Sequence, residues 1–239
     1  MKKITSVLVF IMIACTGFGQ DRVVVDPNAE IRVVNGTFNK IKVSNGIDLY
    51  LSQSSTPGIA ISASEEKFKA RIKTVIENNV LKIYFEDDNA WKNNSSRKLK
   101  AYVSFKDLEE LDASGASDVL VAGSIEAGSF KLNMSGASDF KGDIKATSIM
   151  IDLSGASDIT ISGKSTTVNI ESSGASDVNG YGLVTEICNA KASGASDINI
   201  TVNERMEAHA SGASSIQYKG NGVLKEKHTS GASNISRRS

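Results

Sequence analysis

One column of ionisable residues could do acid–base chemistry. Glycan-cleaving enzymes need converging carboxylates, bases or cations on one face. The same residue types also fit a ladder of solvated side chains that pair between neighbouring strands. We favour the ladder, because the column changes gradually from acidic to basic along the chain. The sequence therefore predicts no catalytic residue and no enzyme, with a carbohydrate-active lyase or hydrolase as the alternative. The column comprises Asp112, Asn133, Asp152, Glu171, Lys191, His209 and His228.

A second set of carboxylates closes five copies of the phrase Ser-Gly-Ala-Ser-Asp. Calcium prefers oxygen ligands, so a stacked row of such groups could bind it. Aspartate also accepts backbone N–H bonds in turns, and Ser215 and Asn234, which replace it in the last two copies, suit a turn as well. We expect structural corner residues and no cofactor, with calcium as the alternative. These aspartates are Asp118, Asp139, Asp158, Asp177 and Asp197.

Tryptophan, cysteine and histidine are the other residue types that could act as binding groups. Trp91, the single tryptophan, lies in a polar segment and is the candidate ligand contact. An indole ring can stack on a sugar or anchor a protein partner, and it can equally fold back onto its own chain. Cys188 falls in an apolar column and is expected to be a buried, inert thiol. The two histidines, embedded in the ionisable column, are too few to predict a zinc site.

The elements that must position these side chains are set by a repeat. A period near twenty residues is typical of a solenoid, in which each coil buries its apolar face against its neighbours. Apolar and polar residues alternate on both sides of the phrase, which is the period of a strand. We expect each coil to contain a strand, a tight corner, a second strand and a short third segment such as Asp143-Ile144. Equivalent strands would pair in parallel about 4.8 Å apart, as in a β-helix. The seven copies begin at Ser114, Ser135, Ser154, Ser173, Ser193, Ser211 and Ser230.

Each corner is expected to turn at its glycine, because a residue with a Cβ would resist the backbone conformation. The alanine beside it is expected to fit where the wall bends inward. The corner glycines are Gly115, Gly136, Gly155, Gly174, Gly194, Gly212 and Gly231.

The first nineteen residues have the features of a secretory signal peptide, with Lys2 and Lys3 before an apolar run. Cleavage after Gly19 or Gln20 is expected, and lipoprotein processing at Cys15 is the alternative. No later apolar run is long enough to span a bilayer. The protein is therefore expected to be exported to the periplasm, the outer-membrane surface or the extracellular space. Its nearly balanced charge argues against nucleic acid as a partner.

The rest of the chain is predicted to form one domain. Residues 20–37 are expected to be a flexible lead-in and first strand, and residues 38–239 a single β-helix. Within it, residues 38–110 would form irregular coils and a cap, and residues 111–239 the regular coils. Solenoid ends need caps because they expose strand edges, and Lys225 and Lys227 in apolar columns suggest one. Expected early strands are Ile31–Val34, Lys40–Val43, Ile47–Leu51, Ile59–Ser62, Arg71–Ile76, Val80–Phe85 and Leu99–Phe105.

Two features together resemble a known family. The segment from Phe38 to Leu51 reads Phe-Asn-Lys-Ile-Lys-Val-Ser-Asn-Gly-Ile-Asp-Leu-Tyr-Leu, and Val80-Leu81-Lys82-Ile83 and the Ser-Gly-Ala-Ser-Asp coils follow it. From about residue 38 to 234 the chain is similar to the putative auto-transporter adhesin, head GIN domain family of bacterial envelope proteins. This resemblance implies an exported, right-handed β-helical protein at the surface or in the periplasm, and it brings no catalytic residues.

The function predicted from the repeat and the resemblance is non-catalytic adhesion, binding or assembly at the cell envelope. The expected partner is a protein or glycan at the cell surface, and self-association into a homo-oligomer is also expected. The alternatives are the carbohydrate-active enzyme and a purely structural envelope spacer.

Overall fold

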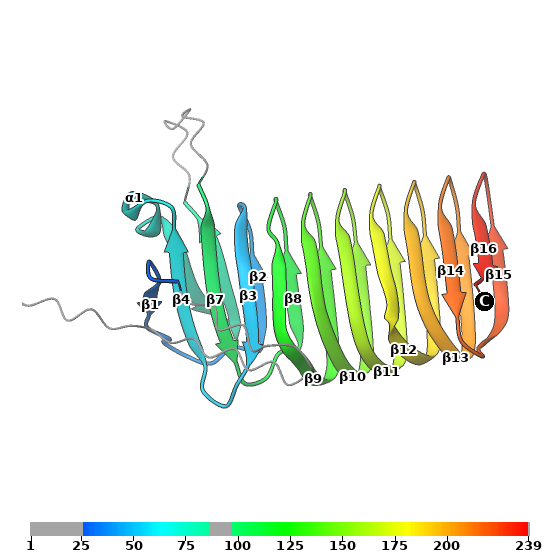
Figure 1. The fold of residues 1–239 in the computed structure, drawn as a ribbon, viewed down its shortest axis with the longest axis horizontal. Helices are drawn as coiled ribbons and strands as arrows, with labels where there is room; N and C mark the ends of the chain where they lie inside the picture. Colours follow the sequence, from blue (N-terminus) through cyan, green and yellow to red (C-terminus); the bar gives the residue numbers. More distant parts are fainter. Residues whose placement is uncertain (1–25, 87–96, 239) are drawn as a thin grey trace, which may run out of the picture.

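The computed structural model describes residues 26–86 and 97–238. The strands of these residues form one 16-stranded sheet that winds into a long stack of coils, as Figure 1 shows. Neighbouring coils in the stack are hydrogen-bonded in parallel from β3 onward. The predicted all-β solenoid is therefore confirmed.

Five long strands form the regular part of the stack, and each follows one corner phrase and ends at the next. Their registers place equivalent residues of successive coils side by side, for example Ile159 beside Val178 and Ile198. The strands are β9 (Val119–Met134), β10 (Asp139–Leu153), β11 (Asp158–Ser172), β12 (Asp177–Ala192) and β13 (Asp197–Ala210).

The short third segment expected in each coil is not a separate element. Asp143 and Ile144 lie in the middle of β10 and pair with Ser162 and Gly163 of β11. The expectation was wrong because pairing between coils continues through the bend, so one strand covers both walls. Register shifts near the bends, such as the one between Lys141 and Asp143, mark where the chain changes direction.

The core is a set of stacked apolar columns inside the coils. The column of Phe130, Ile149, Val168, Cys188 and Met206 is completely buried. Each such side chain contributes about 1.5–3 kcal/mol by leaving water, but only if the next coil covers it. The coils therefore stabilise one another, as the repeat predicts.

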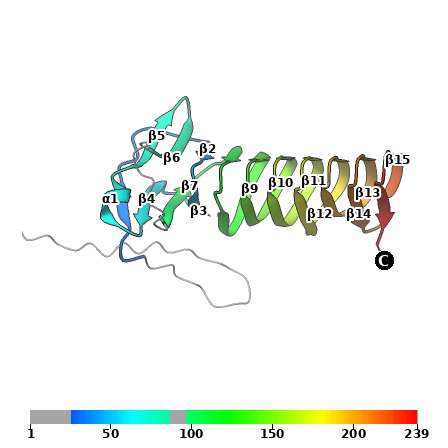
Figure 2. The same ribbon diagram turned by 90° about the horizontal axis from the view of Figure 1, so that it is seen from above.

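The N-terminal end of the stack combines parallel and antiparallel pairing (Figures 1 and 2). Strands β1, β4 and β7 pair antiparallel, as do β5 and β6, whereas β2 and β3 pair in parallel with β8 and β9. One short helix, α1 (Glu66–Lys69), was not predicted; it buries Phe68. The bounds are β1 (Glu30–Arg32), β2 (Lys40–Val43), β3 (Ile47–Gln53), β4 (Gly58–Ala63), β5 (Ile72–Glu77), β6 (Val80–Phe85), β7 (Leu99–Phe105) and β8 (Glu110–Ala113).

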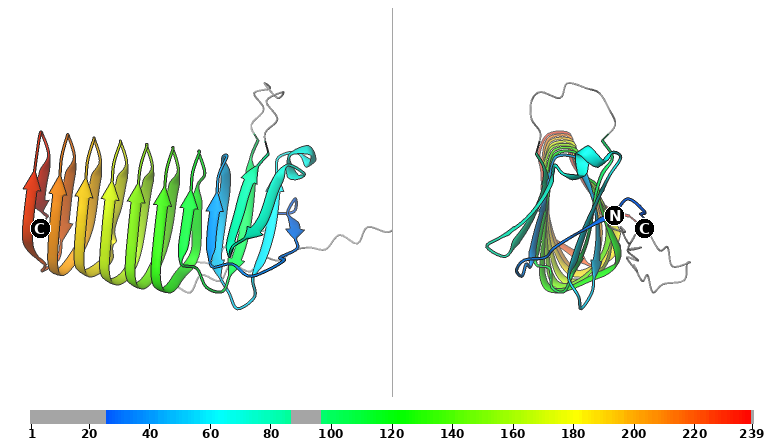
Figure 3. Two further views of the ribbon diagram at one scale, coloured as in Figure 1. Left: turned by 180° about the vertical axis from the view of Figure 1, so that it is seen from behind. Right: turned by 90° about the vertical axis from the view of Figure 1, so that its left-hand side faces the viewer.

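The C-terminal end of the stack is a shorter, more polar coil made of β14 (Ser215–Lys219), β15 (Val223–Thr229) and β16 (Asn234–Arg237). The register shift between Met206 and Glu207 places Leu224 beside Met206, so the prediction that Lys225 takes an apolar column was wrong. Lys227 is the register partner of Ala208 and is exposed, as is Lys225. The Lys227 Nζ donates a hydrogen bond to the Ile235 carbonyl at 2.8 Å. Viewed along the stack in Figure 3, the coils superpose on one another, so side chains at equivalent positions form straight rows.

Candidate functional site

Each corner of the stack turns at a glycine in the left-handed region. The seven phrase glycines have φ between +74° and +85°. A Cβ on Gly155 would lie 2.5 Å from the Gly136 carbonyl oxygen of the preceding coil, which is closer than real Cβ atoms approach. The Ala156 N–H donates to that same oxygen at 2.7 Å. The glycines thus lie in a single file: Gly115, Gly136, Gly155, Gly174, Gly194, Gly212 and Gly231.

The second serine of each phrase, and not the alanine, faces the core. Ala156 and Ala175 are exposed, whereas Ser157 and Ser176 have no exposed surface. The expectation that alanine fits the inward bend was wrong. Strand alternation counted back from Ile159 places Asp158 outside and Ser157 inside. The buried serine ladder is Ser117, Ser138, Ser157, Ser176, Ser196 and Ser214.

Hydrogen bonds of the buried serine ladder hold the corners closed. The Ser157 Oγ donates to the Ser154 carbonyl at 3.2 Å, within one corner. The Ser157 N–H donates to the Ser176 Oγ of the next coil at 3.2 Å. Because buried polar groups need partners, hydroxyls of this ladder bond within their own corner, as Ser157 does, or to a neighbouring coil, as Ser176 does.

The stack contains one more corner, at the Asn45-Gly46 turn signal, which lacks the repeated phrase. In the coil before the first phrase, Asn45 and Gly46 have φ values of +66° and +71°. The Ile47 N–H donates to the Ser117 Oγ at 3.2 Å. The segment from Ser44 to Asp48 therefore stacks on the first Ser-Gly-Ala-Ser-Asp phrase. The Asn-Gly pair with an aspartate two residues later was the available signal.

The aspartates that close the phrases form a continuous row on the outside of the stack. Asp139, Asp158, Asp177 and Asp197 are register partners in successive coils. Asp48 extends this aspartate ladder at its N-terminal end, because Leu49 pairs with Val119. A hollow of about 350 Å³ lies over its first part, between carboxylates and apolar side chains. It is lined in part by Asp48, Tyr50, Asp118, Leu120, Asp139, Phe140 and Asp158.

The aspartate ladder raises the pKa of several of its own members. Partial burial raises the pKa of Asp139, and the negative charges of Asp118 and Asp158 raise it further. Burial, followed by Asp197 and Asp158, raises the pKa of Asp177 in the same way. Burial and the neighbouring Asp118 also raise the pKa of Asp48. The stacked carboxylates thus repel one another.

A groove of about 980 Å³ runs along the stack beside the strands that lead into the corners. It extends from Lys42 in the first coil to His228 in the last. Its floor includes buried residues such as Met134 and Leu153. Two rows of polar side chains flank that floor, and we call the whole surface the polar groove. The first row is the ionisable column predicted from sequence, and the second is the first serine of each phrase: Ser114, Ser135, Ser154, Ser173, Ser193, Ser211 and Ser230.

The structure brings the whole ionisable column together in the polar groove. Asp112, Asn133, Asp152, Glu171, Lys191, His209 and His228 are register partners in successive coils. Lys42 pairs with Asp112 and begins the row. It lies before the repeat and was not predicted as a member of the ionisable column.

Neighbouring side chains pair with the acids of this column. The Glu171 carboxylate accepts from the Lys191 Nζ at 2.8 Å. Asp152 lies 3.5 Å from the Lys131 Nζ, and the Asn133 amide donates to Asp112. Cross-coil pairs of this kind suit a solvated recognition surface, because each group already has a partner and is held in place.

The remaining single-residue predictions concern Cys188, Trp91 and Cys15. Cys188 is fully buried, and burial raises the pKa of its thiol to about 12. Trp91, Cys15 and the predicted signal peptide lie outside the described residues. Within residues 26–86 and 97–238, no helix combines the length and apolar character needed to cross a membrane.

Comparison with known proteins gives a consistent picture of the fold. The family model described as putative auto-transporter adhesin, head GIN domain, matches residues 37–222. None of the curated proteins matches this chain. A crystal structure of a putative adhesin from Bacteroides fragilis is similar, with a TM-score of 0.80 and 20% identity, and covers 88% of this chain and 96% of the other.

Two structures from Parabacteroides distasonis are also similar. A putative adhesin has a TM-score of 0.71 and 19% identity, covering 88% of this chain and 96% of its own. A putative lipid binding protein has a TM-score of 0.65 and 20% identity, covering 89% and 97%. At these identities the likeness shows the shared fold.

Proposed function

Because the chain belongs to the putative auto-transporter adhesin, head GIN domain family, we propose that it is a non-catalytic binding module of the cell envelope. In this proposal the polar groove holds an extended polymer, either a surface glycan or a protein segment. The leader-like sequence at residues 1–19 supports export. The adhesin descriptions of the family and of similar structures support a role at the surface.

The observation that carries this proposal is the length of the polar groove. It passes through every coil from Lys42 to His228, so a chain-like ligand would meet the same two rows of polar groups at each rung. Rungs of a parallel sheet are about 4.8 Å apart. Hydroxyls in one row and acidic, amide and basic groups in the other match ligands rich in hydroxyl or amide groups. A small substrate would instead call for a local pocket with a few converging groups.

The pairing of the acids supports binding over hydrolysis. Glycosidases keep one carboxyl protonated as an acid beside a second that is ionised. In the polar groove, Glu171 is bound by Lys191 at 2.8 Å and Asp152 lies 3.5 Å from Lys131. Both carboxylates thus already pair with cations, an arrangement suited to hydrogen-bond acceptance.

The test compares two double variants on arrays of bacterial glycans and matrix proteins. In the first, Glu171→Ala with Lys191→Ala removes an exposed ion pair from the polar groove. In the matched control, Glu126→Ala with Lys145→Ala removes an exposed pair, 3.5 Å apart, away from it. We expect the groove variant to bind at least about tenfold more weakly, equal to about 1.4 kcal/mol, and the control to bind as wild type.

Three other results would contradict this function. An equal loss in both double variants would place binding outside the polar groove. Absence of any ligand on the arrays and on lipid vesicles would favour a structural spacer. Cleavage of a bound glycan, abolished by Glu171→Gln, would favour the enzyme. The vesicles are included because one similar structure is described as a putative lipid binding protein.

A further inference from the structure

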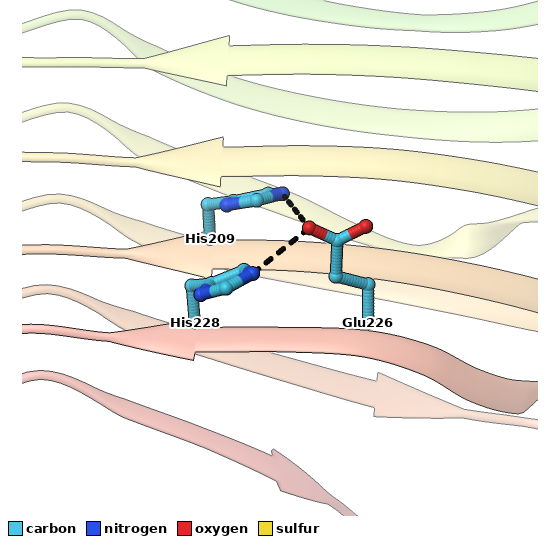
Figure 4. A group of neighbouring side chains, drawn as sticks. All are labelled: His209, Glu226 and His228. Carbon is cyan, nitrogen blue, oxygen red and sulfur yellow. Dashed lines mark hydrogen bonds and ion pairs between the residues drawn. The ribbon is translucent and has the colours of Figure 1, made fainter.

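At the C-terminal end of the polar groove, three side chains with metal-binding atoms lie close together. They are His209 on β13 and Glu226 and His228 on β15, as Figure 4 shows. Their ligand atoms all lie within 4.8 Å of one another. The chain contains two histidines, and both are in this cluster.

Both imidazoles are directed at the same carboxylate oxygen. The His228 Nε2 lies 2.8 Å from the Glu226 Oε1, and the His209 Nε2 lies 3.7 Å from it. The two rings stack with centroids 4.8 Å apart and an angle of 14° between their planes. This arrangement follows from the fold, because His209 and His228 are register partners and Glu226 precedes His228 by two residues on the same face.

We infer that His209, Glu226 and His228 form a binding site for a divalent transition-metal ion of the zinc type. Imidazole nitrogen combined with one carboxylate oxygen suits zinc, nickel and copper, whereas calcium and magnesium prefer oxygen alone. Zinc binds these donors at about 2.0–2.2 Å, which places two donors on one ion about 3–4 Å apart. The two distances to Glu226 Oε1 fall at or near that range.

Little movement is needed to bring the third pair of donors together. The two Nε2 atoms must approach by about 1 Å and their nearly parallel rings must tilt so that both lone pairs meet at the ion. All three side chains are at least 42% exposed, so they can rotate without moving the sheet. A neutral His228 would present an unprotonated Nε2 to the ion in place of its contact with Glu226.

Charged groups around the cluster leave space for a cation. Lys191, the register partner of His209, binds Glu171 at 2.8 Å and is thereby held toward the preceding coil. Glu207 is the register partner of Glu226 and brings a second carboxylate to this edge, with Arg205 at 4.0 Å. Two neighbouring carboxylates repel each other, and a bound divalent ion would relieve that repulsion.

The site spans two coils, so a bound ion would cross-link β13 to β15 near the C-terminal end of the stack. The β13–β15 ladder contains a register shift between Met206 and Glu207, and β15 is largely exposed. The ion would therefore stabilise a pairing whose outer strand is largely exposed. Three protein ligands on a tetrahedral ion also leave one position for water or for a donor from a ligand in the polar groove.

The experiment is a zinc titration of the purified protein without a polyhistidine tag, followed by calorimetry and by NMR of the two imidazoles. We expect one ion per chain and simultaneous shifts of both histidine signals. His209→Ala and His228→Ala should each weaken binding at least about tenfold, in line with the effect of removing metal-site groups. Glu126→Gln, which changes an exposed carboxylate outside the polar groove, is the control and should leave zinc affinity unchanged.

A second readout guards against variants that merely misfold. Amide hydrogen exchange across β15 should slow on addition of zinc in the wild type and in Glu126→Gln, and should stay unchanged in His209→Gln. Zinc affinity that is the same in wild type, His209→Ala and His228→Ala would overturn the inference. A titration that does not saturate below about 1 mM would also overturn it.

Discussion

The N–H of Ser157 donates a hydrogen bond to the Oγ of Ser176, one coil further along the stack, at 3.2 Å. The Ser176 Oγ donates in turn to the Gly155 carbonyl at 3.3 Å. Both serines have no exposed surface. The Ser176 hydroxyl therefore joins two successive corners of the solenoid, acting as both donor and acceptor inside the core.

Removing one of these hydroxyls should destabilise the fold. We expect Ser176→Ala to lower the free energy of unfolding by about 1–2 kcal/mol, because it leaves the buried Ser157 N–H without its partner. Thermal or denaturant unfolding followed by circular dichroism measures the change. The control is Ala175→Ser at the exposed neighbouring position, which should change stability by less than about 0.5 kcal/mol. Equal stability of the two variants would contradict a structural role for the hydroxyl.

The corner glycines should not tolerate even a methyl group. Gly155→Ala would place a Cβ 2.5 Å from the Gly136 carbonyl oxygen at a φ of +82°. The left-handed conformation alone costs about 1–2 kcal/mol, so with the clash we expect a loss of at least about 2 kcal/mol. Gly128→Ala is the matched control, since its Cβ would meet nothing within 4 Å. A similar melting temperature for both variants would show that the corner can relax without cost.

The aspartate ladder should make the protein more stable as the pH falls toward 4. The pKa values of Asp139 and Asp177 are raised in the folded state by burial and by the carboxylates beside them. The folded state therefore holds these protons more tightly than the unfolded state. Their contribution to stability is fully present below the unfolded pKa of about 3.9 and is lost as the pH rises through the raised folded pKa.

Asp158→Asn should reduce the loss of stability at higher pH, because the Asp158 charge helps to raise the pKa of both Asp139 and Asp177. We expect it to stabilise the protein at pH 7 by a few tenths of a kcal/mol, the scale of exposed charge pairs, with little effect below pH 4. Asn234 already occupies the equivalent position in the last coil. Melting curves at both pH values, with calcium and with chelator, make the measurement. A calcium-dependent stabilisation of the wild type that Asp158→Asn removes would show instead that the ladder binds the ion.

Cys188 should not react with thiol reagents in the folded protein. It is fully buried and its thiol has a pKa of about 12 because of burial, so almost no thiolate forms at neutral pH. Alkylation followed by peptide mapping should find Cys188 unmodified under native conditions and modified in denaturant. Mapping is needed because the sequence also contains Cys15. Rapid native modification of Cys188 would show that the coil around β12 opens readily.

The repeat made the stack predictable. Few folds other than a solenoid combine alternating apolar and polar residues with a repeat of about twenty residues. The bounds of β2, β6 and β7 also followed directly from local patterns. The inward direction of Ser157 was not predicted. The alanine was placed inside because it is small, whereas the in–out alternation of the following strand determines which residue faces the core. The Asn-Gly turn at Asn45 was not recognised as a corner of the stack, because Asn45, Gly46 and Ile47 stand where the phrases have glycine, alanine and a buried serine.

The polar groove was only partly predictable. The repeat aligned its column from Asp112 to His228, since equal spacing puts equal positions side by side. Spacing also places Glu226 and His228 on one face of β15. It does not specify side-chain rotamers, and the convergence of two imidazoles on one oxygen depends on them. The prediction that two histidines are too few for a zinc site counted the histidines alone. The structure places a carboxylate, that of Glu226, beside both of them.

The uniform corners have a consequence for how such a protein can change its size. The glycine carbonyl of each interior phrase accepts a hydrogen bond from the alanine N–H of the next phrase. Duplicating or deleting one whole unit would therefore recreate this bond at every corner. The reach of the binding surface can be lengthened or shortened by one unit at a time, while the specialised segments at both extremities stay as they are.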